Sequence, residues 1–290
     1  MSAPAVLFDA PGPKTVARHR LYTIVAAVVL LGVVAFVVWR LYDSDQLEYE
    51  KWEPFLTPRY ITALLVDGVL VTLQMAFSAV LGAVVFGVIF GPGKLSDHAV
   101  IRWFSWAVVE FFRAVPVLLL MILIFFSYGI TRGESGAYWS VVIALTLYNG
   151  AVLAEVFRAG VLAVPTGQAE AAYAIGMRKT QVMNIVLLPQ AVKIMLPAII
   201  SQCVVALKDT SLGYAVAAPG LTLVGRDIYN GFGNQVPTVI VLAVLYVAIN
   251  LVLTAIATWV QKKFVGEKEP LTVSLVGKTD AGSGLAPGAP

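Results

Sequence analysis

The chain has 290 residues, of which 59% are apolar and 13% are charged, and its mean hydropathy is +0.84. These values exclude a water-soluble globule and are typical of a helical membrane protein with several spans. The apolar runs do not alternate with period two, which disfavours a β-barrel. The net charge of +3 is small and scattered, so no nucleic-acid partner is expected, and the single cysteine, Cys203, excludes an intrachain disulfide.

The N-terminal part predicts a basic tail, a first span and an acidic loop. Residues 1–20 are expected as a cytoplasmic tail and residues 21–42 as an extra transmembrane helix. No small-residue cleavage site follows this apolar run, so we expect a retained span rather than a signal peptide. Residues 43–63 form an outer loop rich in acidic and aromatic side chains.

Further apolar runs predict about six spans in total. They cover residues 61–90, part of 104–130, 138–157, 188–207 and 236–260. Small residues recur every four positions on the second span (Ala79, Ala83, Gly87 and Gly91), which predicts close helix packing. Residues 262–290 are expected as a cytoplasmic tail without fixed structure.

The distribution of the basic residues predicts how these spans are oriented in the membrane. Thirteen Lys and Arg residues lie in the two tails and in the segments near 94–102 and 158–193, whereas five lie in the alternate segments. Arg113 and Lys208 fall at membrane depth. The excess predicts that both termini and the 158–193 segment are cytoplasmic.

A polar interruption, Gly167 to Pro189, separates the fourth and fifth predicted spans. Its first part predicts a short helix, with Thr166 as the N-cap and Glu170 in the first turn. Small and apolar residues form a stripe at helical spacing: Ala169, Ala172, Tyr173, Gly176 and Met177. Gly176 is suited to a turn or a close contact. The spacing alone also fits an amphipathic loop helix lying on lipid headgroups.

Specific residues of this interruption resemble a known motif. Glu170-Ala171-Ala172, Gly176 and Val186-x-Leu188-Pro189 resemble the EAA loop of ABC-importer permease subunits, here at about residues 161–190. The resemblance implies an all-α, type I ABC-importer transmembrane fold over residues 64–261. It also implies that the loop helix docks in a cleft of a separate ATPase subunit. The implied coupling residues are Gly167, Glu170, Ala171, Ala172, Tyr173, Gly176, Met177 and Arg178.

Other segments resemble the polar amino acid permeases, and the whole chain is similar to glutamate permease subunits of actinobacteria. They are Gly68–Leu73, Glu110–Pro116 (with Ala114-Val115 in place of the usual Gly-Thr), Glu155-x-x-Arg158-x-Gly160 and Lys208–Leu212. The implied partners are two copies of an ABC ATPase, an identical or paralogous permease, an extracytoplasmic substrate-binding protein and the lipid bilayer. ATP and Mg²⁺ would be bound by the ATPase, and no cofactor by this chain.

No catalytic machinery is recognisable. Gly91-Pro92-Gly93-Lys94 lacks the spacing of a P-loop, and His19 and His98 have no metal-like partners. Neither an enzymatic activity nor a metal site is therefore expected.

Ionisable residues at membrane depth cost about 2.5–3.5 kcal/mol each on insertion scales, so each requires an explanation. One explanation is pairing: Glu110 with Arg113, Glu155 with Arg158, and Lys208 with the neighbouring Asp209 or with another helix. The other is a substrate pocket, in which Arg113 and Lys208 bind a carboxylate. The candidate path residues are Thr72, Gln74, Glu110, Arg113, Asn149, Glu155, Lys208, Asp209, Thr210 and Ser211.

Two other functions remain open at this point. A secondary transporter driven by an ion gradient would show internal repeats, and none is convincing. A membrane scaffold would not need the charges at membrane depth.

Overall fold

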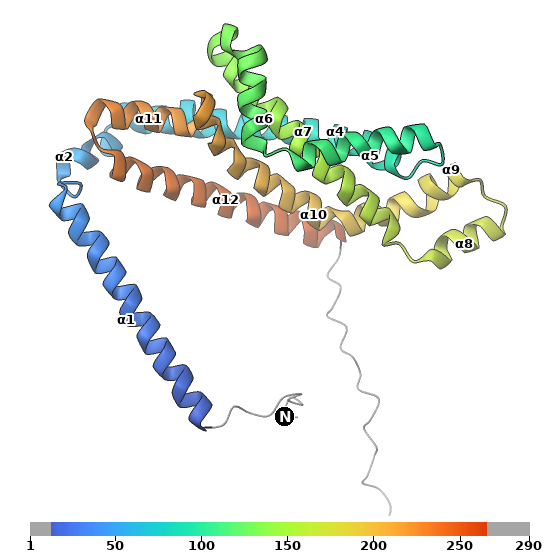
Figure 1. Ribbon diagram of the computed structural model, residues 1–290, viewed down its shortest axis with the longest axis horizontal. Coiled ribbons are helices and arrows are strands. Elements are labelled where there is room, and N and C mark those ends of the chain that lie inside the picture. Colours follow the sequence, from blue (N-terminus) through green and yellow to red (C-terminus); the bar gives the residue numbers. More distant parts are fainter. Residues whose placement is uncertain (1–12, 266–290) are drawn as a thin grey trace, which may run out of the picture.

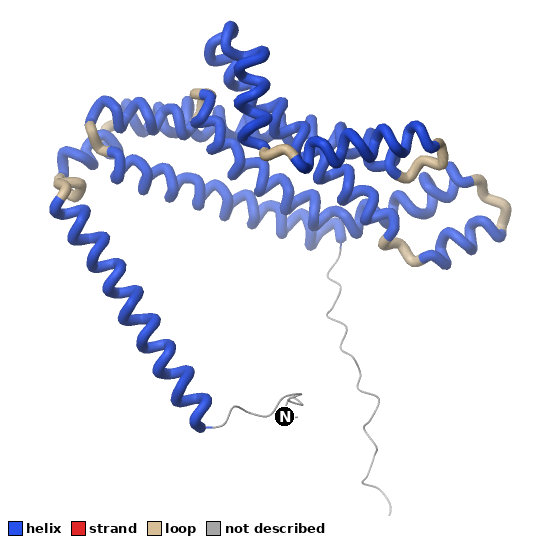
Figure 2. Tube along the Cα trace, in the orientation of Figure 1, coloured by secondary structure: helices blue, strands red, loops and turns tan. Residues whose placement is uncertain are grey.

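The computed structural model describes residues 13–265, and every regular element in this range is helical (Figure 2). No β-strand occurs within it, which confirms the all-α prediction. Most of the two predicted tails, residues 1–12 and 266–290, lies outside the described residues.

The helices follow one another with short turns between them. The long helices are α1 (Pro13–Asp43), α4 (Val71–Lys94), α7 (Gly133–Leu162), α10 (Leu188–Asp209) and α12 (Gln235–Val265). The shorter ones are α2 (Tyr49–Trp52), α3 (Pro58–Thr62), α5 (Ala99–Ala114), α6 (Val117–Ile124), α8 (Thr166–Ala174), α9 (Lys179–Gln181) and α11 (Leu221–Phe232). Short π-helical stretches, η2 (Ala63–Leu70), η3 (Phe125–Gly129) and η5 (Val182–Leu187), and 3-10 helices, η1 (Glu53–Leu56), η4 (Ile130–Arg132) and η6 (Thr210–Val216), join them.

Within residues 13–265, five stretches are long and apolar enough to cross a membrane: Lys14–Asp43, Pro58–Lys94, Val117–Leu162, Lys179–Val216 and Gln235–Gln261. Together they contain five of the six predicted spans. The predicted third span is divided, because Val115 and Pro116 have extended backbone and a proline disfavours helix at the residue before it. α5 ends before this break, and α6 continues through η3 and η4 towards α7.

α4 and α7 lie side by side in the centre of the bundle (Figure 1). The small residues of α4 form this contact: Ala79 and Ala83 are each 1% exposed, and a Cβ on Gly87 would lie 3.2 Å from the carbonyl carbon of Leu153. The predicted close packing is therefore confirmed. Any larger side chain at Gly87 would push the two helices apart.

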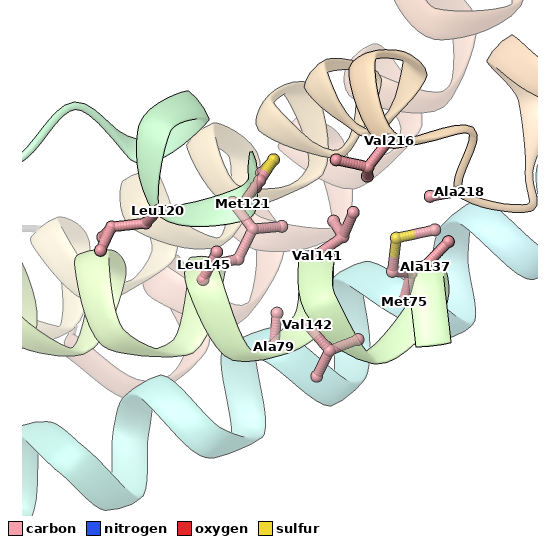
Figure 3. Close-up of a cluster of buried hydrophobic side chains, with 11 residues drawn as sticks. Met75, Ala79, Leu120, Met121, Ala137, Val141, Val142, Leu145, Val216 and Ala218 are labelled. Atoms are coloured by element: carbon pink, nitrogen blue, oxygen red, sulfur yellow. The ribbon is translucent and has the colours of Figure 1, made fainter. Parts of the chain in front are cut away.

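The largest buried apolar cluster lies where α4, α6 and α7 meet (Figure 3). Met75 of α4, Met121 of α6 and Leu145 of α7 are each at most 2% exposed. Val216 of η6 also belongs to this cluster. This cluster joins α6 to the long helices despite the break at Pro116.

The two ends of the bundle carry different segments (Figure 1). At one end, which we call the α8 end, Lys179 of α9 forms an ion pair with Asp97 in the turn between α4 and α5. At the opposite end, the α11 end, Lys51 Nζ donates hydrogen bonds of 3.4 Å to the carbonyl oxygens of Phe232 and Gly233. α1 diverges from the bundle, and none of its apolar window is buried.

Candidate functional site

Residues 163–181 form a segment, here named the α8 segment, that connects α7 to η5 and α10. Within it, Thr166 is the first residue of α8 and Pro165 occupies the N-cap position, so the predicted cap at Thr166 is wrong. The predicted turn near Gly176 is confirmed, because the φ of +83° at this residue is a conformation that favours glycine. Nothing lies within 4 Å of a Cβ built there.

The residues of the predicted apolar stripe differ in how far they are buried. Ala172 is buried and Ala169 and Met177 are half-buried, whereas Tyr173 is 48% exposed. Ile175, outside the predicted stripe, is 80% exposed. The other predicted coupling residues, Gly167, Glu170, Ala171, Gly176 and Arg178, are also exposed. The segment thus presents an aromatic and an aliphatic side chain on a polar surface.

Two contacts attach the α8 segment to the long helices. The hydrogen bond and the charge of Lys179 lower the pKa of the Asp97 carboxyl, which belongs to the turn after α4. Val164, within the segment, is buried and packs in an apolar cluster with Val161 of α7 and Met195 of α10. A displacement of the α8 segment would therefore also move the turn after α4 and the parts of α7 and α10 that it contacts.

Lys94 joins three helices near the α8 end. Its Nζ lies 3.0 Å from Oε1 of Glu110 on α5 and 2.6 Å from Oε2 of Glu155 on α7, and its side chain is 6% exposed. Lys94 is absent from the predicted site residues. Spacing along a sequence indicates neighbours on one helix, but not partners on another.

Two predicted pairs within helices are confirmed around Lys94. Arg113 Nη1 lies 3.2 Å from Glu110 Oε1, and Arg158 Nη2 lies 2.6 Å from Glu155 Oε1. The predicted path residues Glu110, Arg113 and Glu155 thus share one ion network, in which three cations face two carboxylates. No group of three or more His, Cys, Asp or Glu side chains in the described part could hold a metal ion.

Asn149 joins α7 to α10. It is 1% exposed, its Nδ2 donates to the carbonyl oxygen of Leu145 at 3.0 Å, and its Oδ1 accepts a hydrogen bond of 2.5 Å from Nε2 of Gln202. Gln202 is not among the predicted site residues. Its amide, inside the apolar run 188–207, is the sequence signal that could have identified it.

Thr72 holds the start of α11 against α4. Its hydroxyl oxygen accepts a 2.9 Å hydrogen bond from the backbone N–H of Leu221, and both residues are buried. The preceding Gly220 has a φ of +132°, and a Cβ there would lie 2.8 Å from the Thr72 hydroxyl. Thr210, another predicted path residue, is buried and donates to the carbonyl oxygen of Leu207 at 2.6 Å.

The remaining predicted path residues are more accessible. Gln74 and Lys208 are exposed, and Asp209 and Ser211 are half-buried. Within residues 13–265, Lys208 forms no ion pair, so the predicted pairing with Asp209 or with another helix is wrong. The structure therefore separates the predicted path residues into the Lys94 network, the Asn149 contact and the region around η6 and the start of α4.

Comparison with known proteins agrees with this architecture. Residues 83–266 match the family model described as the binding-protein-dependent transport system inner membrane component. The chain is 39% identical over 226 residues to the glutamate transport system permease protein GluD of Corynebacterium glutamicum, covering 77% of this chain and 83% of that protein. It is 33% identical over 199 residues to the probable glutamine ABC transporter permease protein GlnP of Bacillus subtilis, covering 67% of this chain and 91% of that one.

Solved structures share the fold. A chain of an amino acid ABC transporter crystallised with histidines superposes with a TM-score of 0.64 at 27% identity, covering 71% of this chain and 95% of that one. A chain of the inward-facing MetNI methionine ABC transporter gives 0.62 at 25% identity, covering 71% and 99%. The chain belongs to the family of binding-protein-dependent transport system inner membrane components.

Proposed function

We propose that this chain is the permease subunit of an ATP-driven importer of polar amino acids, with L-glutamate as the preferred substrate. The observation that carries the proposal is the α8 segment. It presents Glu170, Ala171 and the Gly176 turn at its surface, and it is attached to the long helices through the Lys179–Asp97 ion pair and the packing of Val164 near Met195. The similarity to a glutamate transport system permease supports the choice of substrate.

Coupling to ATP would occur through the exposed side of the α8 segment. Tyr173 and Ile175 present apolar surface that a cleft in an ATPase subunit can bury. Two ATPase subunits would hold ATP and Mg²⁺, and their closure would move one α8 segment on each of two permeases. The segment only transmits free energy, so nucleotide must bind one arrangement of the assembly more tightly than the other.

The proposed orientation places the α8 end in the cytoplasm, together with both termini. Thirteen of the twenty Lys and Arg residues belong to the segments assigned to that side. The ion pair between Asp97 and Lys179 supports the assignment, because it joins two of these segments. A substrate-binding protein would then dock at the α11 end.

Lys208 is the proposed cation for the substrate carboxylate. It is exposed at the end of α10, and an unpaired cation facing lipid at this depth would cost about 2.5–3.5 kcal/mol. A translocation path shared with a second permease, identical or paralogous, would give Lys208 a polar environment. Arg113 is less suited, because Glu110 already accepts hydrogen bonds from its guanidinium.

Uptake by vesicles tests this function. The chain is co-reconstituted with its candidate ATPase and binding protein, and uptake of labelled glutamate is competed with unlabelled glutamate, glutamine, aspartate, arginine or histidine. We expect uptake that requires internal ATP and is competed most strongly by glutamate. Uptake driven by an ion gradient without ATP would indicate a secondary transporter, and a chain that transports nothing in any combination would indicate a scaffold.

A further inference from the structure

A polar cavity of about 590 Å³ lies at the α8 end, between α4, α5 and α7. Lys94 lines it from α4, Glu155 and Arg158 from α7, and Ala99, Arg102, Trp103, Trp106 and Glu110 from α5. Coupling to ATP and substrate binding, as proposed above, give no role to Arg102 or to the two tryptophans.

The charge lining this cavity favours an anion. Lys94, Arg102 and Arg158 outnumber Glu110 and Glu155. Lys94 and Arg158 pair with these carboxylates, so Arg102 is the lining cation that forms no ion pair within the described residues. Arg102 Nη1 donates to the carbonyl oxygens of Ser96 at 2.9 Å and Asp97 at 3.3 Å. These bonds orient the Arg102 guanidinium without neutralising its charge, so it can still bind a phosphate.

One wall of the cavity is both apolar and exposed. Trp103 and Trp106 are 68% and 52% exposed, and the neighbouring Val100 and Phe104 on α5 are also exposed. Tryptophan is enriched where a membrane helix meets the headgroup layer, since its ring is apolar and its N–H can donate. An anion bound here would therefore lie beside a surface suited to hydrocarbon chains.

We propose that this cavity binds the phosphate of an anionic phospholipid, whose acyl chains lie along the exposed face of α5. Basic pockets between membrane helices on the cytoplasmic side bind such headgroups. The proposal does not depend on which amino acid is transported. A lipid in this position would contact α4, α5 and α7, the three helices that Lys94 joins.

Fluorescence quenching by brominated lipid tests the proposal. The full-length chain, with any subunits that co-purify, is placed in phosphatidylcholine nanodiscs containing increasing fractions of brominated phosphatidylglycerol. Brominated phosphatidylcholine with the same chains is the reference lipid. We expect the anionic lipid to quench tryptophan fluorescence at a lower fraction than the reference lipid does. The chain has six tryptophans, so the double variant Trp103→Phe, Trp106→Phe shows which of them are quenched. We expect the difference between the two lipids to disappear in this variant.

Charge variants test the headgroup contact. Arg102→Gln and Arg158→Gln should each raise the fraction of anionic lipid needed for half-quenching about five-fold. Arg132→Gln, at the end of η4 and outside the cavity, should leave it unchanged. Equal quenching by the two lipids would overturn the proposal, as would suppression of the difference by millimolar inorganic phosphate, which would identify a free anion as the occupant. If the arginine variants aggregate on gel filtration, the proposal is tested by the tryptophan double variant: it is overturned if the difference between the two lipids persists in that variant.

Discussion

The Gln202 side chain of α10 donates a 2.5 Å hydrogen bond to the Asn149 side chain of α7, at a position where both helices are otherwise mostly apolar. α10 follows directly on η5, the continuation of the α8 segment. The amide contact and the packing of Gly160 on Met195 therefore join α7 and α10 at two levels. We infer that the two helices respond together when the α8 segment moves.

A double-mutant cycle measures the amide contact. Asn149→Leu, Gln202→Leu and the double variant are unfolded from mixed micelles with increasing SDS. Hydrogen bonds between membrane helices contribute about 0.6 kcal/mol on average and at most about 1.7 kcal/mol, so a coupling free energy in this range is expected. Strictly additive effects of the two substitutions would show that the contact contributes nothing.

The packing of α4 on α7 predicts a second, larger effect. Gly87→Leu would insert a side chain against the backbone of Leu153, and overpacking of this kind costs about 1–3 kcal/mol or more. Gly32→Leu is the matched control, because nothing lies within 4 Å of a Cβ at that position of α1. The same SDS unfolding should show a loss for Gly87→Leu and almost none for Gly32→Leu. Equal losses would contradict the packing of these helices.

The attachment of the α8 segment should depend on pH. Lys179 lowers the pKa of Asp97, so the pair stabilises the attachment above the ordinary carboxyl pKa, and this contribution is lost as pH falls through the lowered value. Hydrogen exchange of residues 175–182, corrected for its intrinsic pH dependence, should be slowest at neutral pH and faster in acid. In Asp97→Asn the neutral-pH protection should already be reduced, and high salt should reduce it in the wild type. Identical protection in wild type and Asp97→Asn would contradict this attachment.

Two substitutions separate the proposed substrate cation from the ion network. Lys208→Gln should reduce glutamate uptake about ten-fold or more, since a hydrogen bond to a charged group contributes about 1.5–3 kcal/mol. Arg113→Gln should lower the stability of the chain, because Glu110 loses a partner, and should affect uptake less per folded molecule. Unchanged uptake by Lys208→Gln, at a normal amount in the membrane, would remove Lys208 from the path.

The sequence predicted what depends on neighbours along the chain. Apolar runs located most of the spans, four-residue spacing of small residues located the face of α4 that packs on α7, and i,i+3 spacing identified Glu110–Arg113 and Glu155–Arg158. Pro116 lies inside a predicted span, yet it divides the helix there. The break could have been predicted from the sequence, because a proline disfavours helical backbone at the residue before it.

Contacts between helices were not predictable in the same way. The partners of Lys94, the bond from Gln202 to Asn149 and the role of Thr72 at the start of α11 depend on which helix faces which. A single sequence contains no record of these distances. For the same reason it suggested a pair between Lys208 and Asp209, which are adjacent on one helix but point differently, since residues one apart on a helix do not face each other.

The central claim is that the α8 segment couples ATP hydrolysis to transport, and the most direct measurement is the number of glutamate molecules imported per ATP hydrolysed in reconstituted vesicles. Gly176→Asp is compared with Gly133→Asp, which shares a positive φ and open space around the Cβ but lies far away, at the start of α7. We expect Gly176→Asp to lower the ratio about ten-fold or more, since loss of about 1.4 kcal/mol of coupling suffices, while Gly133→Asp keeps it. A wild-type ratio in Gly176→Asp would contradict the account.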